Sequence, residues 1–307
     1  MPKAQPDKTP TVSVVVPVYN RPDRVAAIAQ TLRRQTFANW EVVFVDDGSE
    51  AARRPSLGDL DKDPRFRLVV LPENRGPSAA RNAGVRAAVG AYVAFLDSDD
   101  DWAPEKLARQ VQAVQAHPDP ACVFCVTQTQ VIMPDGWVRV RPDFSPAPGQ
   151  SFAEYLYCDG GFAQASALLL ARELAMDHPF HETLRQYEDH LFYIALHAAG
   201  LHYLVIAEPL SVWRNDARPD RLSAHDDTAR GDQFLAIAAP LLSKRAALAF
   251  QLRVQGPARL RAQPIKTARL AAQALLSRAL SPKTLAMLTA RLLIPQRLWR
   301  QIQKLAP

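Results

Sequence analysis

An apolar stretch that ends in a cluster of carboxylates constrains the fold more than any other feature of this sequence. Residues 91–96 are Ala-Tyr-Val-Ala-Phe-Leu, and they are followed by Asp97, Asp99, Asp100 and Asp101. Apolar residues at every position are typical of a parallel strand that is buried between two helix layers. The sequence therefore predicts an α/β fold with an acidic cluster at the carboxyl end of a central strand.

Asp97 and Asp99 are two residues apart, with Ser98 between them. Alternate residues of an extended chain point to the same side, so these two carboxylates can converge on one hard divalent cation. The alternative is a solvated loop or a helix N-cap, because the helix expected at 104–116 begins a few residues later. Crowded carboxylates beside a buried strand need a counter-charge, which favours the metal or ligand interpretation.

Strands and helices alternate along the first part of the chain. Apolar runs and amphipathic segments predict strand 12–19, helix 23–35, strand 41–45, strand 67–71, helix 78–89, strand 91–96 and helix 104–116. This order predicts a Rossmann-like, mostly parallel sheet flanked by helices, which binds its ligand at the carboxyl ends of the strands. Polar residues follow three of these ends, at 17–20, 46–49 and 97–101, so we expect a site there.

The second part of the chain continues the α/β pattern and then becomes helical. We expect strands at 121–131, 137–140, 166–171 and 203–213, a proline-rich loop at 142–149, and helices at 186–199, 228–250 and 297–305. The sequence thus predicts a disordered N-terminus over 1–10, an α/β domain over 11–227 and a basic, amphipathic helical region over 228–307. The α/β domain divides into halves at 11–116 and 117–227.

Three features predict a protein of the cytoplasm. No run of about 18 apolar residues occurs, so no single helix is expected to span a membrane. Residues 1–10 are polar and proline-rich without an apolar core, which is unlike a secretory signal peptide. The three cysteines do not form the even set that is typical of a secreted disulfide scaffold.

The net charge of +6 conceals an uneven distribution along the chain. No Asp or Glu follows Asp232, and residues 241–307 contain 13 of the 37 basic residues. The first 240 residues therefore hold 24 basic against all 31 acidic residues, a balance of −7. Such asymmetry indicates a tail that meets an anionic surface.

Four short motifs, in this order and spacing, resemble those of one enzyme family. They are Val-Ser-Val-Val-Val-Pro-Val-Tyr-Asn at 12–20, Val-Asp-Asp-Gly-Ser at 45–49, Asn-Arg-Gly-Pro-Ser-Ala-Ala-Arg-Asn-Ala-Gly at 74–84 and Phe-Leu-Asp-Ser-Asp-Asp at 95–100. Over residues 11–215, and weakly after 120, the chain resembles the family 2 glycosyltransferases with the GT-A fold. The resemblance implies hexosyl transfer from a nucleotide-sugar with inversion at the anomeric carbon, Mn²⁺ or Mg²⁺ as cofactor, and a role in bacterial surface-polysaccharide assembly.

The resemblance also implies roles for single residues on the donor side. The nucleotide-sugar site would be lined by Pro17, Tyr19, Asn20, Asp47, Arg81, Asp97 and Ser98. Asp47 would accept a hydrogen bond from a uracil-type base, Arg81 would face the diphosphate and Asp97 would lie near the ribose. Asp99 would ligate the metal, which neutralises the leaving diphosphate without proton transfer. For Arg81, a solvated helix face is the alternative.

On the acceptor side, the resemblance assigns the catalytic base to Asp189, because an inverting transfer needs a group that removes the proton of the acceptor hydroxyl. Asp at a helix start is also an ordinary cap, and one carboxylate can serve both purposes. Glu188 would orient the acceptor. Further acceptor or loop candidates are Asp100, Trp213, Arg214 and His225. For His225, a place at the metal competes with that of a plain loop residue.

The expected partners are a UDP-sugar, a glycan or lipid-linked acceptor, and an anionic membrane surface on the inner face of the plasma membrane. Alternatively, the C-terminal helices pack on the catalytic domain or on a second copy in a homo-oligomer. Two other functions stay open. A nucleotidyltransferase usually has a Gly-rich basic loop that residues 19–22 do not resemble, and a non-catalytic protein would use the basic tail for binding. No nucleic-acid partner is expected, because the tail has few aromatic residues and no known nucleic-acid motif.

Overall fold

The computed structural model describes residues 9–215, 228–256, 259–260 and 263–293. The chain divides into two compact units. Unit 1 combines Met1–Ser145 with Phe162–Pro219, and unit 2 combines Pro146–Gly161 with Asp220–Pro307. The helix expected over 297–305 lies outside the described residues, as does most of the expected disordered N-terminus.

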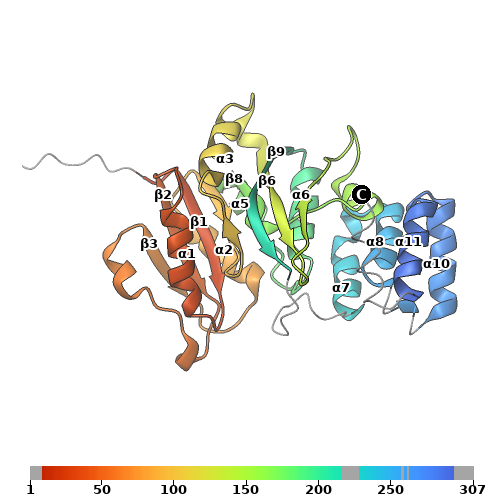
Figure 1. Ribbon diagram of the computed structural model, residues 1–307, viewed down its shortest axis with the longest axis horizontal. Coiled ribbons are helices and arrows are strands. Elements are labelled where there is room, and N and C mark those ends of the chain that lie inside the picture. The colour runs from red at the N-terminus through yellow and green to blue at the C-terminus, as the bar shows by residue number, and fades with distance from the viewer. Residues whose placement is uncertain (1–8, 216–227, 257–258, 261–262, 294–307) are drawn as a thin grey trace, which may run out of the picture. The chain divides into compact units, whose positions relative to one another are not determined.

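The first half of unit 1 is a parallel sheet. Its strands are β1 (Val12–Val18), β2 (Trp40–Asp46), β3 (Phe66–Val70) and β4 (Tyr92–Phe95), in the spatial order β3-β2-β1-β4. Helix α1 (Asp23–Arg33) connects β1 to β2, and α2 (Pro77–Ala87) connects β3 to β4 (Figure 1). The predicted alternation of strands and helices is confirmed. Because all four strands are parallel, their carboxyl ends meet at one edge of the sheet.

The second half of unit 1 extends the same sheet with mixed directions. Strand β8 (Leu168–Ala171) is antiparallel to both β4 and β6 (Val123–Ile132), and β9 (His202–Arg214) runs parallel to β6. The short strands β5 (Asp101–Trp102) and β7 (Val138–Arg141) pair antiparallel with β9 and β6. Since β4 and β6 both oppose β8, they share one direction, and their carboxyl ends lie toward the same edge.

Helices cover both faces of this sheet (Figure 1). On one face, Val14 and Val16 of β1 belong to one buried cluster with Ile28 of α1 and Val111 of α3 (Lys106–Gln115). On the other face, α2 lies so close to β1 that a Cβ on Gly84 would overlap the side chain of Val15. Helices α5 (Arg172–Asp177) and α6 (Glu188–Ala198) complete unit 1.

Phe95 of β4 makes edge contacts with two rings of the α6 region. The ring centroids of Phe95 and Phe180 are 5.2 Å apart, those of Phe95 and Phe192 are 6.2 Å apart, and Phe180 stacks on Phe192 at 4.0 Å. Contacts of this kind add to the burial of apolar area. They fix the start of α6 beside the end of β4.

Unit 2 contains α4 (Phe152–Glu154), α7 (Thr228–Ala238), α8 (Lys244–Arg253), α10 (Pro264–Leu276) and α11 (Pro282–Leu293). Tyr157, from the segment that is distant in sequence, packs its ring 5.0 Å from Phe250, which in turn stacks on Phe234 at 4.7 Å. The aromatic cluster explains why residues 146–161 belong to the helical unit. None of the helices in the described part of the chain has both the length and the apolar content needed to cross a membrane.

The single helix expected over 228–250 is wrong, because the structure has two helices there. Helix α7 ends at Ala238, and a short 3₁₀ turn over Ala239–Leu241 precedes α8. Pro240 lacks the backbone N–H that a continuing helix would need. Ser243 then caps the new helix, since its Oγ accepts a hydrogen bond of 3.1 Å from the Ala246 N–H.

Candidate active site

Asp47 lies directly after β2 and is buried at 4% exposure. Its Oδ1 accepts a hydrogen bond from the Arg75 N–H and its Oδ2 accepts one from the Gly76 N–H, both at 2.8 Å. Burial raises the pKa of Asp47, although these two donors oppose the shift. Gly76 has φ +91°, a conformation that favours glycine. Asp47 thereby attaches the loop before α2 to the end of β2, and each of its oxygens keeps one further lone pair.

The loops after β1 and β2 are joined by Asn20. The Asn20 N–H donates to Ser49 Oγ at 2.8 Å, and the Glu50 N–H donates to Asn20 Oδ1 at 3.0 Å. Asn20 has φ +54°, which asparagine tolerates better than most residues. Nearby, Tyr19 is 42% exposed and Pro17 is half-buried. The structure therefore brings two of the predicted strand ends into contact.

Ser166, which was not predicted from the sequence, anchors the acidic loop after β4, residues 97–101. Ser166 Oγ accepts from the Asp97 N–H at 3.0 Å and donates to Asp100 Oδ2 at 2.5 Å. Gln164 Nε2 also donates to Asp100 Oδ2, at 2.8 Å. Asp100 is thus buried and points inward, as a support for the loop, and Ser98 is buried as well. No residue pattern in the sequence marks Ser166, because it comes from a turn about 70 residues later.

Asp97 and Asp99 keep partly exposed carboxylates, with 30% and 15% of their side chains exposed. Asp99 Oδ2 lies 3.4 Å from Nη1 of Arg21, which follows β1. Hard oxygen donors with access to solvent fit a divalent cation, and the neighbouring guanidinium shows that this position favours positive charge. Among the described residues, no group of three His, Cys, Asp or Glu side chains gathers around one point.

Arg81 of α2 is buried at 3% exposure between two carboxylates. Its Nη2 lies 2.7 Å from Asp97 Oδ1, and its Nη1 lies 3.1 Å from Glu188 Oε1. The guanidinium carbon is 5.2 Å from the centroid of the Phe180 ring. The two acidic partners raise the pKa of Arg81 despite its burial. Arg81 therefore does not lie on a solvated helix face.

Glu188 and Asp189 form the first turn of α6, as expected from the sequence. Tyr187, with φ +64°, precedes them, so the chain turns sharply just before the helix begins. Burial raises the pKa of both carboxyls, to about 6 for Asp189, while Arg81 opposes both shifts. Burial also lowers the pKa of His190 to about 4.

Asn82 attaches the segment before α6 to α2. Its Nδ2 donates to the Phe180 carbonyl at 2.9 Å, and its Oδ1 accepts from the Phe180 N–H at 2.9 Å. This pair of bonds mimics a strand pairing and was not expected from the sequence. It fixes the distance between Arg81, the residue of α2 that precedes Asn82, and the chain that leads to Glu188.

The remaining candidates lie at the end of β9 or beyond it. Trp213 is half-buried, is in register with Val131 of β6 and places its ring 6.2 Å from that of Phe162. Arg214 is exposed at the end of the strand. His225 lies outside the described residues.

Comparison with known proteins gives the class of this fold and site. The model of the family described as glycosyl transferase family 2 matches residues 13–175. The solved structure of S. aureus TarS 1-349 in complex with UDP-GlcNAc is similar with a TM-score of 0.61 at 18% identity, over 91% of this chain and 86% of that chain. The mannosyltransferase PcManGT from Pyrobaculum calidifontis, in complex with GDP-Man and Mn²⁺, gives a TM-score of 0.57 at 21% identity over 97% and 85%. The fold is therefore GT-A.

Among relatives in sequence, the amylovoran biosynthesis glycosyltransferase AmsB of Erwinia amylovora is 30% identical over 207 residues. The match covers 65% of this chain and 68% of AmsB. The chain belongs to glycosyltransferase family 2, and it is a glycosyltransferase.

Proposed function

We propose that this protein is a metal-dependent, inverting glycosyltransferase of the cytoplasm. It moves a sugar from a nucleoside-diphosphate sugar to a hydroxyl of a glycan or lipid-linked acceptor in the assembly of a bacterial surface polysaccharide. The observation that carries the proposal is the convergence of two groups of residues at one place. Asp97, at the end of β4, and Glu188, at the start of α6, contact the same guanidinium of Arg81, so Asp189 lies next to the donor-side carboxylates. The AmsB name supports the polysaccharide setting.

On the donor side, Asp47 holds the nucleotide base, and Pro17, Tyr19, Asn20 and Ser98 belong to the same nucleotide-sugar site. Asp47 is suited to this role because its backbone partners fix its position and leave one lone pair on each oxygen. A base N–H can then donate to a carboxylate that needs no rearrangement. The complex of TarS with UDP-GlcNAc supports a UDP-sugar as the donor.

Asp99 holds the divalent metal, Mn²⁺ or Mg²⁺, with Asp97 beside it and oriented toward the ribose. When bound, the cation supplies neutralisation of the charge that develops on the leaving diphosphate. The carboxylate of Asp99 is partly exposed, and the guanidinium of Arg21 lies beside it. Both observations support this assignment. The Mn²⁺ in the PcManGT complex also supports it.

Asp189 is the base that removes the proton from the acceptor hydroxyl as that oxygen attacks the anomeric carbon. With its pKa raised to about 6, Asp189 is ionised at neutral pH but is a stronger base than an exposed aspartate. Glu188 orients the acceptor, and Trp213 and Arg214 at the end of β9 border the acceptor side.

Turnover with a defined base variant tests this function. Release of nucleoside diphosphate from a panel of nucleotide-sugars is measured with Mn²⁺ and with short glycan or lipid-linked acceptors. The wild type should release one nucleotide in the presence of acceptor, and Asp189→Asn should bind the donor equally but lose turnover by at least about 100-fold. Retained turnover in Asp189→Asn would remove Asp189 as the base, and no release from any donor would contradict the function.

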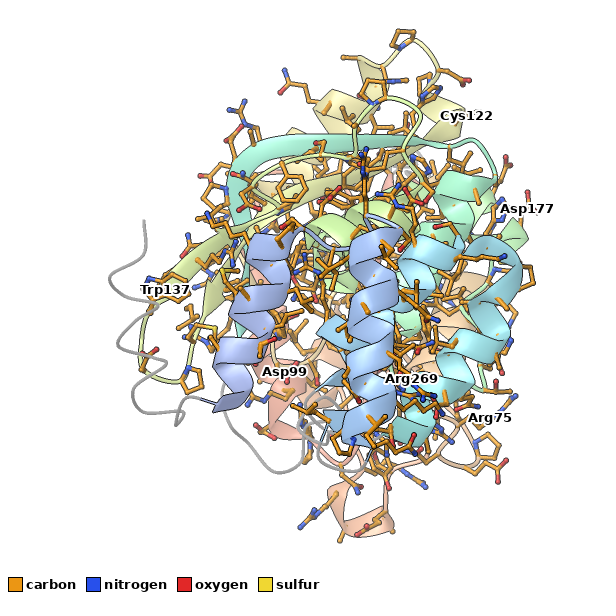
Figure 2. The ribbon with its side chains drawn as sticks, turned by 90° about the vertical axis from the view of Figure 1, so that its right-hand side faces the viewer. Arg75, Asp99, Cys122, Trp137, Asp177 and Arg269 are labelled. Carbon is orange, nitrogen blue, oxygen red and sulfur yellow. The ribbon has the colours of Figure 1, made fainter. Side chains whose placement is uncertain are left out.

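We further propose that α10 and α11 of unit 2 bind an anionic membrane surface. Ile265 and Leu276 of α10 are 73% and 87% exposed, and Met287 of α11 is 49% exposed. Ile265 and Leu276 are three turns apart and so lie on one face of the helix. The basic side chains Lys266 and Arg269 are exposed on the same helix, and Arg269 is labelled in Figure 2. Exposed apolar groups next to basic ones, without any Asp or Glu after Asp232, are typical of an interfacial helix.

Vesicle flotation tests the membrane proposal. The full chain should float with phosphatidylcholine vesicles that contain phosphatidylglycerol. With vesicles of pure phosphatidylcholine, the protein should stay at the bottom of the gradient. The double variant Ile265→Ser/Leu276→Ser should lose most of this binding, whereas Met176→Ser, at an exposed apolar position of α5 in unit 1, should not. If the double variant floats like the wild type, or if it only dissociates a dimer in light scattering, this face does not bind the membrane.

A further inference from the structure

A buried guanidinium at the centre of the candidate site has a role that donor binding does not explain. Arg81 is 3% exposed, and both of its terminal nitrogens are engaged by carboxylates from different elements, Asp97 after β4 and Glu188 in α6. Its Nε is buried without a hydrogen-bond partner. A residue that binds a substrate diphosphate would need terminal nitrogens that the phosphate oxygens can reach. Here they connect two parts of the protein instead.

The charges around Asp189 show what this connection provides. Glu188 and His190 flank Asp189 on α6, while Asp97 faces it from the end of β4 and Arg81 faces it from α2. Burial and Asp97 both disfavour the ionised form of Asp189, and burial keeps His190 neutral. Arg81 is therefore the positive charge that offsets this cluster of carboxylates.

The geometry also limits which residue can replace Arg81. A guanidinium presents several N–H donors in one plane, so it can bind Asp97 and Glu188 at the same time. A lysine ammonium is a point charge on a flexible stem, so it would hold one carboxylate less firmly than the other. Substitution of Arg81 by lysine should therefore keep the positive charge but weaken the simultaneous contact with Asp97 and Glu188.

We propose that Arg81 is a positioning residue that holds the start of α6 against Asp97 and keeps the base Asp189 ionised at neutral pH. This inference rests on the proposed role of Asp189. Arg81 acts through these carboxylates and does not contact the donor phosphates. It therefore links the donor side of the site, through Asp97, to the base that activates the acceptor.

The pH profile of kcat tests this role, because a merely structural residue would lower turnover without moving the profile. In Arg81→Gln the acidic limb should move up by at least about one pH unit, so that turnover falls at least about fivefold near pH 6 and largely recovers above pH 8. Arg81→Lys retains the charge and should shift the limb less. The Kd of the nucleoside diphosphate with Mn²⁺ should change less than about threefold in both variants. The control Arg86→Gln, at an exposed position of the same helix, should match the wild type.

Two results would overturn the inference on Arg81 alone. One is an unmoved acidic limb in both Arg81 variants, although the wild type is active and Asp189→Asn is not. The other is a loss of nucleotide affinity of tenfold or more, which would make Arg81 a donor ligand. If Arg81→Gln does not fold, the Arg81→Lys profile decides. A wild type without turnover, or an active Asp189→Asn, would instead contradict the proposed function, and the inference with it.

Discussion

At the scale of single residues, the site places carboxyl groups where their ionisation has a cost. Asp189 sits at the start of α6, where burial raises its pKa from 3.8 to about 6. Below pH 4 the group is protonated in both the folded and the unfolded chain, and above about pH 6 it is ionised in both. Between these values the folded state binds more protons, so the contribution of Asp189 to the free energy of unfolding falls as pH rises. At the proposed base, the raised pKa that would favour function therefore reduces stability.

Replacing this carboxylate should stabilise the protein while it stops turnover. At pH 7.5, Asp189→Asn should increase the free energy of unfolding by about 1 to 2 kcal/mol, discounted for the partial exposure of the side chain. The gain should disappear below about pH 4, where the wild-type carboxyl is protonated as well. Urea denaturation at several pH values measures this. Asp177→Asn, at an exposed position of α5, should show no such gain. A loss of stability in Asp189→Asn at neutral pH would contradict the pKa assignment.

At the scale of elements, the sequence predicted those parts whose pattern is local. The apolar runs of β1, β2 and β4 and the stripe of α1 were sufficient to predict a parallel sheet and the edge at which its polar strand ends meet, because buried strands and amphipathic helices have their own periodicities. The position of Ser166 under the acidic loop and the bonds of Asn82 to Phe180 could not be predicted, because they join segments about 70 to 100 residues apart. Arg81 was expected near the diphosphate, and its contact with Glu188, 107 residues further along the chain, could not be predicted for the same reason.

The support of the acidic loop by Ser166 can be tested directly. Ser166→Ala removes the acceptor of the Asp97 N–H and one donor to Asp100, so the free energy of unfolding should fall by about 1 to 3 kcal/mol. The affinity for nucleoside diphosphate with Mn²⁺ should fall as well, because the loop that carries Asp99 loses its anchor. Chemical denaturation and calorimetric titration measure the two effects. Ser145→Ala, at an exposed position of unit 1, is the control. Normal affinity in a destabilised Ser166→Ala protein would show that the loop positions itself without this residue.

Close packing of α2 on β1 also belongs to this scale. In an ordinary helix, Gly to Ala gains about 1 kcal/mol from helix propensity. In Gly84→Ala the new methyl group would overlap Val15, so we expect a loss of about 1 to 3 kcal/mol instead. The double variant Gly84→Ala/Val15→Ala should show a favourable coupling energy in a thermodynamic cycle, because the smaller Val15 substitute removes the overlap. Additive effects would mean that the two elements do not limit each other.

At the scale of the whole molecule, the two units differ in charge as they differ in proposed function. The acidic side chains of the proposed site lie in unit 1, and the described part of unit 2 after Asp232 has basic residues without acidic ones. The sequence predicted this division from charge alone. It did not predict that residues 146–161 belong to the helical unit, because the contact of Tyr157 with Phe250 depends on tertiary packing. The central claim concerns unit 1: the edge formed by β1, β2 and β4 binds a nucleoside diphosphate through a metal at Asp99.

Thermal unfolding with nucleoside diphosphates, each with and without Mn²⁺, tests this claim most directly. For one nucleotide, at 100 times its Kd, the wild type should be stabilised by about 2.7 kcal/mol only when Mn²⁺ is present. Asp99→Ala should lose this increase in Tm, and Asp59→Ala, at an exposed position of the same unit, should keep it. An equal increase without Mn²⁺, or an undiminished increase in Asp99→Ala, would contradict metal-dependent nucleotide binding at this edge of the sheet.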